Sequence, residues 1–320
     1  MSRKRALEIF RGERGALPPQ CSARKDDCLS ASARVSSLQR SEEVQGRKIS
    51  SARRDRDFQS SQDLVDASET VDEILGGRLR VIQKRRGYRF SIDSLLLADF
   101  VRLREGDDLL DLGTGSGIIA LILADRHHGG KVLGIEIQAE LAAMASRSAA
   151  VNGLAGRVEI RPGDVRRPET ICPPRSFDAV VFNPPYRRLG SGRTNPDSQK
   201  AVARHEIKGG AADFLAAAAF ALPEGGRVYT IYPAPRMVEM LCRMRTCKIE
   251  PKRMRVVHSR PGGAGMFTLV EGVMHGREEL AVLPPLFIYA EGGGYTEEMS
   301  VILGGPSAFR HDGGDRSLWS

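Results

Sequence analysis

A strand, a glycine-rich turn and a helix follow one another without interruption in the middle of the chain. Residues 109–112 read Leu-Leu-Asp-Leu and are predicted to be the first core strand. Residues 113–117 read Gly-Thr-Gly-Ser-Gly, and residues 118–124 form an apolar helical segment. Glycines let a backbone approach a ligand closely, and the first turn of a helix presents free N–H groups. This combination favours the α/β class, in which parallel strands alternate with helices.

The pattern of strand and helix repeats on both sides of this turn. Further strands are predicted over residues 131–136, 158–160, 177–182 and 227–232, and an antiparallel pair over 254–258 and 266–273. We predict four strand–helix units within about 80 residues, in a doubly wound, mostly parallel sheet of seven strands closed by a C-terminal antiparallel hairpin. Ahead of this sheet we expect a short strand pair formed by residues 71–83 and 84–91, and a helix over 92–103.

Carboxylates follow several of these predicted strands. The glycine spacing differs from the G-x-G-x-x-G/A pattern of dinucleotide sites, because Ile118 stands at the sixth position. Asp111 just before the glycines is more typical of S-adenosylmethionine (SAM) sites, where it can face the methionine ammonium. Glu136 can accept from both ribose hydroxyls, and Asp164 from the adenine amino group. Exposed carboxylates with no ligand are the alternative. The predicted cofactor-binding residues are Asp111, Gly113, Gly115, Gly117, Glu136, Asp164, Val165 and Asn183.

A second motif, Asn-Pro-Pro-Tyr, follows the apolar run over residues 179–182. An Asn at the carboxyl end of a parallel strand projects into the crevice where open α/β sheets bind ligands. Two prolines fix the backbone and remove two N–H donors, so nearby carbonyls stay free to accept hydrogen bonds. This arrangement can hold a planar group that carries an NH2; a turn that merely ends the strand is the alternative. The predicted catalytic residues are Asn183, Pro184, Pro185 and Tyr186.

The chain is basic as a whole and most basic after this motif. Its net charge is +8 and its isoelectric point is near 9.4, which favours a polyanionic partner such as nucleic acid. The segment over residues 187–208 is glycine-rich and basic, and could hold a phosphate backbone, although a solvated charged loop is the alternative. The predicted substrate-binding residues are Arg187, Arg188, Arg193, Arg204 and His205.

The two ends of the chain differ from its middle. Residues 1–69 are rich in Ser and charged residues and are expected to be a disordered basic extension, followed by a folded domain over 70–305 and a flexible tail over 306–320. No apolar run approaches a membrane span, and no signal peptide is expected. Five cysteines without zinc-ligand spacing predict free thiols, no metal site and a cytoplasmic location.

Residues 71 to about 303 resemble the bacterial family of tRNA(1)(Val) adenine-37 N6-methyltransferases. The resemblance implies a Rossmann-like class I fold, SAM as the methyl donor, and an adenine in the anticodon loop of a tRNA as the acceptor. It rests on residues 84–98, on Asp-Leu-Gly-Thr-Gly-Ser-Gly over 111–117, on Asn-Pro-Pro-Tyr over 183–186, on Ala-Arg-His-Glu over 203–206 and on Leu-Pro-Pro-Leu over 283–286.

The glycine and Asn-Pro-Pro-Tyr motifs are shared by many amino-methyltransferases, so other acceptors stay open. A protein glutamine N5-methyltransferase would use the same loop, because a side-chain amide is also planar and carries an NH2. A guanine-N2 or DNA adenine methyltransferase and a non-catalytic RNA-binding module of the same fold are further alternatives. An NAD-dependent dehydrogenase fits the glycine spacing least well.

Overall fold

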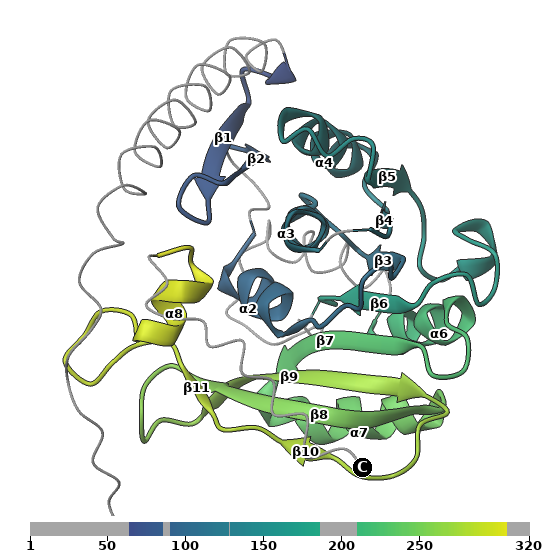
Figure 1. Cartoon of the computed structure of the whole chain (residues 1–320), viewed down its shortest axis with the longest axis vertical. Coiled ribbons are helices and arrows are strands. Elements are labelled where there is room, and N and C mark those ends of the chain that lie inside the picture. Colours follow the sequence, from purple (N-terminus) through teal and green to yellow (C-terminus); the bar gives the residue numbers. More distant parts are fainter. Residues whose placement is uncertain (1–63, 86–89, 128, 186–209, 306–320) are drawn as a thin grey trace, which may run out of the picture. The chain divides into compact units, whose positions relative to one another are not determined.

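The computed structural model describes residues 64–85, 90–127, 129–185 and 210–305 (Figure 1). All of them fall within one compact unit, Asp57–Ser320. The predicted tail over 306–320 and the predicted N-terminal extension, apart from residues 64–69, lie outside the described residues.

A nine-stranded sheet forms the centre of this unit. Its first five strands in space run parallel, in the order β5, β4, β3, β6 and β7, and the antiparallel hairpin of β9 and β8 follows. The strands are β3 (Leu109–Leu112), β4 (Val132–Glu136), β5 (Val158–Pro162), β6 (Ala179–Phe182), β7 (Arg227–Pro233), β8 (Ile249–His258) and β9 (Gly265–Met274).

The direction of winding reverses between β3 and β6. From β3 the chain adds β4 and then β5 on one side, and from β6 it adds β7 on the other. In this class of sheet, ligands bind outside the carboxyl ends of the strands at the point where the order reverses. Leu112 pairs with Phe182 across this point, so the glycine turn and the Asn-Pro-Pro motif leave the sheet side by side.

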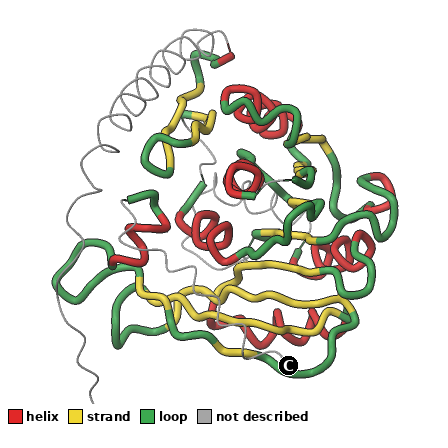
Figure 2. Tube along the Cα trace, in the orientation of Figure 1, coloured by secondary structure: helices red, strands yellow, loops and turns green. Residues whose placement is uncertain are grey.

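Helices cover both faces of the sheet (Figure 2). One face packs against α2 (Ile92–Phe100) and α3 (Ile118–Arg126), and α4 (Ala139–Val151) belongs to the same layer; the other face packs against α6 (Ala211–Ala221) and α7 (Met237–Thr246). Neighbouring strand residues point alternately to the two faces of the sheet. Val181 lies in the apolar cluster on the side of α2 and α3, and Phe182 lies in the cluster on the side of α6 and α7. The prediction of a doubly wound sheet is confirmed.

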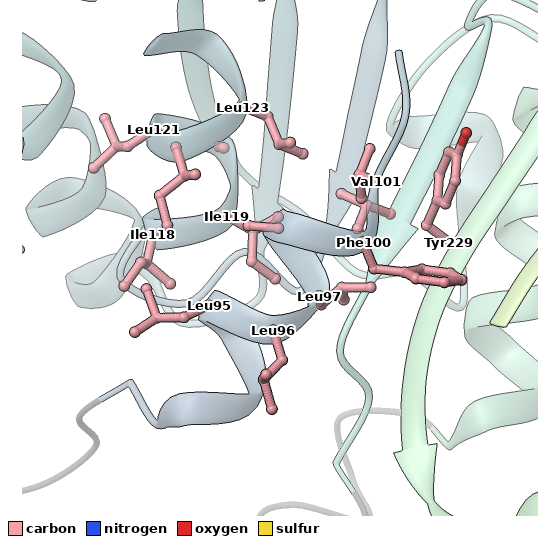
Figure 3. Packing of buried hydrophobic residues seen from close by; sticks show 14 of the residues in the cluster. Leu95, Leu96, Leu97, Phe100, Val101, Ile118, Ile119, Leu121, Leu123 and Tyr229 are labelled. Carbon is pink, nitrogen blue, oxygen red and sulfur yellow. The ribbon is translucent and has the colours of Figure 1, made fainter. Parts of the chain in front are cut away.

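The end of α2 is held by the sheet, and the helix is shorter than predicted. Figure 3 shows Phe100 and Val101, at this end, beside Tyr229 of β7. The Tyr229 hydroxyl donates to the Arg102 carbonyl at 2.6 Å, and the Arg253 guanidinium donates to the Phe100 carbonyl at 2.8 Å. Because these groups bind the carbonyls from outside, the chain leaves the helix at Val101 rather than at residue 103.

Two details of the strand prediction were wrong. Both strands of the N-terminal pair, β1 (Glu69–Ile74) and β2 (Leu79–Lys84), come from the first predicted piece, because the chain already turns back at Leu75–Gly76, both with positive φ. The sheet has two more strands than the predicted seven: β10 (Ala281–Val282) and β11 (Leu286–Phe287) extend its edge by pairing with β8, before α8 (Glu297–Ile302).

The third predicted strand–helix unit lacks its α-helix. Between β5 and β6 the chain forms only the short 3-10 helix η2 (Pro168–Thr170). Prolines at 168, 173 and 174 remove donors from any longer helix in this crossover, which explains the difference. A second 3-10 helix, η3 (Ala234–Arg236), follows β7.

The described part of the chain also bears on three simpler expectations. Cys172, Cys242 and Cys247 are free thiols. Within the described ranges no cluster of three or more His, Cys, Asp or Glu side chains is arranged to hold a metal ion. No helix in those ranges has both the length and the apolar character that a membrane crossing requires.

The N-terminal strand pair docks on α4 through side chains of the helix. The Ser148 hydroxyl accepts from the Ile82 N–H at 2.9 Å, and the Asn152 amide accepts from the Arg80 N–H at 2.9 Å while donating to its carbonyl at 2.6 Å. Ser148 and Asn152 are one helical turn apart, so together they satisfy one edge of β2 as a neighbouring strand would.

Replacing Ser148 with Ala is expected to lower the free energy of unfolding by about 1–3 kcal/mol, because it leaves the buried Ile82 N–H without a partner. Ser146→Ala, on the exposed side of the same helix, is the matched control, since it has the same effect on helix propensity. Denaturant unfolding of both variants measures the difference. Equal stabilities would show that the hydrogen bond to Ile82 contributes nothing.

Candidate active site

Backbone hydrogen bonds join the loops that leave β3, β4 and β5. The Thr114 N–H donates to the Ile135 carbonyl at 2.9 Å, and the Gly163 N–H donates to the Glu136 carbonyl at 3.0 Å. The Gly115 N–H donates to the Glu136 carboxylate at 3.1 Å. The three loops that carry the predicted cofactor residues therefore form one connected edge.

The glycine turn requires glycine at its first and last positions for reasons of space and of backbone conformation. Gly113, Gly115 and Gly117 have φ of 69°, 59° and 80°. A Cβ at Gly113 would lie 2.9 Å from the Phe214 ring, and one at Gly117 would lie 3.0 Å from the Ala145 Cβ. The turn is thus packed tightly from below, and α3 begins directly after it at Ile118.

Asp111 is buried beneath this turn, with 1% of its surface exposed. Its carboxylate accepts a hydrogen bond from the Thr114 hydroxyl at 2.6 Å. Burial raises the pKa of Asp111 to about 7, although hydrogen bonds from Thr114 and from the Ala120 backbone oppose that shift. Asp111 therefore holds the turn from inside, and its expected contact with the methionine ammonium stays a prediction.

Glu136 is also buried, and its two carboxylate oxygens accept hydrogen bonds from two different loops. One carboxylate oxygen accepts from Gly115, and the other accepts from the Gln138 N–H at 2.9 Å. A carboxylate fixed in this way at the end of β4 has further lone pairs with which to accept from a ribose hydroxyl. Its contact with a ribose stays a prediction.

Ser116 carries a polar atom that has no partner among the described residues. Its hydroxyl is buried, and it forms no hydrogen bond there although 97% of the residue's surface is covered. Unsatisfied buried hydroxyls are uncommon in folded proteins. A hydroxyl of this kind within a glycine turn, next to the first turn of a helix, suits a polar ligand, so these residues fit the cofactor predicted for them.

Asp164 and Val165 lie after β5 and have different surroundings. The Asp164 carboxylate is paired with the Arg166 guanidinium, with a closest N–O distance of 2.5 Å, and hydrogen bonds from Arg166 lower the pKa of Asp164. Val165 is buried in the apolar cluster that also contains Phe214. Asp164 can still accept from an adenine amino group, since an ionised carboxylate has about four lone-pair positions, whereas Val165 acts through packing.

The Asn-Pro-Pro motif stands directly beside the glycine turn. Asn183 follows Phe182, the last residue of β6, and it is partly buried, while Pro184 is buried. The Phe182 and Phe214 rings are 5.5 Å apart, and Phe214 also limits the space at Gly113. One aromatic ring from α6 thus supports both loops.

The structure brings together the predicted residues along the order β5, β4, β3 and β6. Three strand spacings of about 4.8 Å separate the Asp164 loop from Asn183, roughly 14 Å in all. The other predicted residues lie outside the described ranges: Tyr186, Arg187, Arg188, Arg193, Arg204 and His205.

Sequence reasoning missed Thr114, Ser116 and Phe214. Thr114 and Ser116 stand between the glycines, and their polar side chains in an apolar context were a signal that could have been used. Phe214 lies in an Ala-rich helix that offers no such signal, because its contact with Gly113 depends on how α6 packs on the sheet.

Comparison with known proteins shows what this chain is similar to. Residues 88–241 match the family model described as the methyltransferase small domain. This match covers slightly less than half of the chain.

Two proteins similar to this chain have the same name. The tRNA1(Val) (adenine(37)-N6)-methyltransferase of Porphyromonas gingivalis is 33% identical over 154 residues, which cover 48% of this chain and 60% of that protein. The protein of that name from Pedobacter heparinus is 28% identical over 215 residues, which cover 67% of this chain and 89% of that protein.

A solved structure has the same fold. A predicted O-methyltransferase from Agrobacterium tumefaciens superimposes with a TM-score of 0.55 at 23% identity, over 68% of this chain and 98% of that one. The predicted α/β fold with a doubly wound, mostly parallel sheet is confirmed, and S-adenosylmethionine as the cofactor stays a prediction.

Gly113→Ala is expected to raise the Kd for SAM at least tenfold, because the new methyl group must displace either the turn or the Phe214 ring. Gly153→Ala is the matched control: its φ of 68° is close to the 69° of Gly113, but no atom lies within 4 Å of the added methyl group. Both variants carry similar backbone strain. Calorimetric titration that gave equal SAM affinities for the two variants would contradict the role of the contact with Phe214.

Asp111 is expected to make the cofactor-free domain less stable as pH rises from about 4 to about 7. Its folded pKa of about 7 lies above its ordinary value of 3.8, so the folded state binds its proton more tightly, and stability is lost until the pH passes 7. Between pH 5 and pH 7 the loss is about 2 kcal/mol.

Asp111→Asn removes this titration and keeps an acceptor for the Thr114 hydroxyl. The difference in unfolding free energy between the unsubstituted protein and this variant is therefore expected to fall from pH 5 to pH 7 and to stay constant above pH 8. A constant difference over the whole range would show that Asp111 titrates normally.

Proposed function

We propose that this protein transfers a methyl group from SAM to the exocyclic amino group of an adenine in RNA, and most specifically to A37 of a tRNA. The register of β3 and β6 carries this proposal, because it sets Asn183 beside the glycine turn at the reversal point of the sheet. The names of the two relatives support the choice of adenine N6 and of tRNA.

The cofactor residues are those that the sheet edge brings together. Gly113, Gly115 and the Ser116 hydroxyl would hold the methionine part above Asp111, Glu136 would accept from the ribose, and Asp164 from the adenine amino group. When bound, SAM supplies an electrophilic methyl group on a sulfonium ion.

Asn183 and Pro184 would orient the acceptor. The lone pair of adenine N6 is delocalised into the ring, so the nitrogen is a poor nucleophile. The Asn183 side-chain oxygen and the Pro184 carbonyl would each accept one N6 hydrogen bond, which favours a pyramidal nitrogen with its lone pair directed at the donor. Such orientation and electrostatic stabilisation need no covalent participation by the protein, and the proton can leave after transfer.

The residues that follow Pro184 would contribute to binding of the RNA. Tyr186, the last residue of the Asn-Pro-Pro-Tyr motif, offers a ring on which the base can stack, and Arg187, Arg188, Arg193, Arg204 and His205 can contact the RNA backbone. A base in an anticodon loop is largely unpaired, so turning it into a site costs less than extracting it from a duplex. The net charge of +8 supports a polyanionic substrate.

A labelling experiment with four acceptors tests this function. Labelled SAM is offered with total tRNA, ribosomal RNA, DNA and a release factor that carries a glutamine substrate. Labelling of tRNA alone is expected; labelling of the release factor alone would indicate the glutamine N5 reaction. A synthetic anticodon hairpin with A37, compared with one in which A37 is replaced by G, tests the position.

Asn183→Ala is expected to lower kcat at least 100-fold on RNA while leaving the Kd for SAM within about twofold. Removing one positioned hydrogen-bonding group from an active site typically costs a factor of 100 to 1,000. Asn152→Ala at the contact between β2 and α4 is the matched control, because it removes an amide remote from the carboxyl edge of the sheet. Turnover by Asn183→Ala close to that of the Asn152 variant would rule out the role assigned to Asn183.

A further inference from the structure

Two tyrosines stack on each other near the end of the described chain. The ring centroids of Tyr289 and Tyr295 are 5.3 Å apart, and the rings are inclined by 14°. The chain turns between them through Gly293 and Gly294, both with positive φ, and the two tyrosines form an isolated β-bridge. Tyr295 is the outer ring, with 47% of its surface exposed.

This tyrosine pair lies at the same edge of the sheet as Asn183. The chain after β11 continues alongside the end of β8, since the Ile288 N–H donates to the His258 carbonyl at 3.0 Å and the Tyr289 N–H to the Ser259 carbonyl at 2.9 Å (Figure 1). β8 runs in the same direction as β6, and β7 and β9 lie between them. Because Tyr289 follows β11, one strand beyond β8, four strand spacings separate it from β6, about 19 Å.

Arg260 adds a positive charge to this surface. It lies in the loop between β8 and β9, and its guanidinium is 5.9 Å from the centre of the Tyr289 ring. It forms no ion pair within the described part of the chain, and it is exposed. The loop is fixed by the His258 ring, whose Nδ1 lies 2.8 Å from the Gly263 carbonyl oxygen.

Neighbouring carboxylates determine what this surface can bind. Glu291 and Glu297 are exposed on either side of Tyr295 in the sequence, and Glu298 is paired with Arg255 at 2.6 Å. Acidic groups disfavour a row of phosphates here. A flat exposed ring with an arginine nearby instead suits a nucleobase, because every base has a face that can stack on an aromatic side chain.

We infer that Tyr295, supported by Tyr289 and Arg260, is a platform on which an unpaired base of the RNA substrate stacks, a few nucleotides from the acceptor adenine. This inference rests on the proposed function and adds an RNA-positioning residue remote from the acceptor loop. If the tyrosine pair served only to close the turn over residues 290–294, loss of the outer ring would affect stability and leave RNA affinity unchanged.

The test measures the Kd for an anticodon hairpin RNA at fixed salt concentration, together with the Kd for SAM and the thermal unfolding midpoint. Tyr295→Ala is expected to weaken RNA binding about 5- to 150-fold, the range found for loss of one base–aromatic stack. Tyr295→Leu keeps an apolar cover over Tyr289 and is expected to weaken binding to the same extent, which guards against a folding defect in the Ala variant. Neither variant should change SAM binding.

Two control variants separate stacking from other effects. Tyr295→Phe retains the ring and is expected to bind RNA within twofold of the unsubstituted protein. Val282→Ala removes an apolar side chain of β10 that is more exposed than Tyr295, and it should change nothing. Val282 pairs with Met254, four residues before the end of β8. The slope of log Kd against log salt should be the same for Tyr295→Ala as for the unsubstituted protein, because no phosphate contact is lost.

RNA affinities of Tyr295→Ala and Tyr295→Leu within twofold of the unsubstituted value would overturn the inference, as would a Phe variant as weak as the Ala variant. Failure of the proposed function gives a different result. If the unsubstituted protein binds the hairpin through Tyr295 but does not methylate it, the platform stands and the proposed reaction does not. If it neither binds nor methylates RNA, both are wrong.

Discussion

The site depends on the contact between Gly113 and the Phe214 ring. Phe214 also packs on Phe182, the residue before Asn183, so one side chain supports both the glycine turn and the segment that begins at Asn183. Because protein interiors are close-packed, neither loop can shift without moving the ring between them. In the proposed reaction, the spacing between methyl donor and acceptor, on which an in-line transfer depends, would therefore be set in the core rather than at the surface.

Two buried carboxylates reduce the stability that this tight packing provides. Asp111 and Glu136 lie on adjacent strands beneath the glycine turn, and the charge of Glu136 contributes to the raised pKa of Asp111. Burial of such charges reduces stability unless hydrogen bonds or a ligand compensate. Thr114, Gly115 and Gln138 supply part of that compensation, and a cationic cofactor would supply more. We regard this loss of stability as part of the site's preparation for SAM.

The sequence was most informative where chemistry and backbone conformation are local. Glycine spacing, the apolar strands and the Asn-Pro-Pro motif each depend on a few neighbouring residues, so the parallel sheet, α4 and the site edge were predicted with nearly correct bounds. Three features depend on distant partners. The end of α2 depends on Tyr229 and Arg253, and the turn of the N-terminal strand pair depends on the packing of that pair against α4. The two extra strands depend on their pairing with β8. The support that Phe214 gives to both loops was unpredictable for the same reason.

The position of the transferred methyl group tests the central claim most directly, because two adjacent acceptors match an NH2 group and not a ring nitrogen. RNA methylated with an isotope-labelled methyl donor is digested to nucleosides, and the labelled product is compared by mass spectrometry and chromatography with authentic standards. Label in N6-methyladenosine is the predicted result. Label on a ring nitrogen or carbon of adenine, on guanine N2, or in no nucleoside would contradict the account.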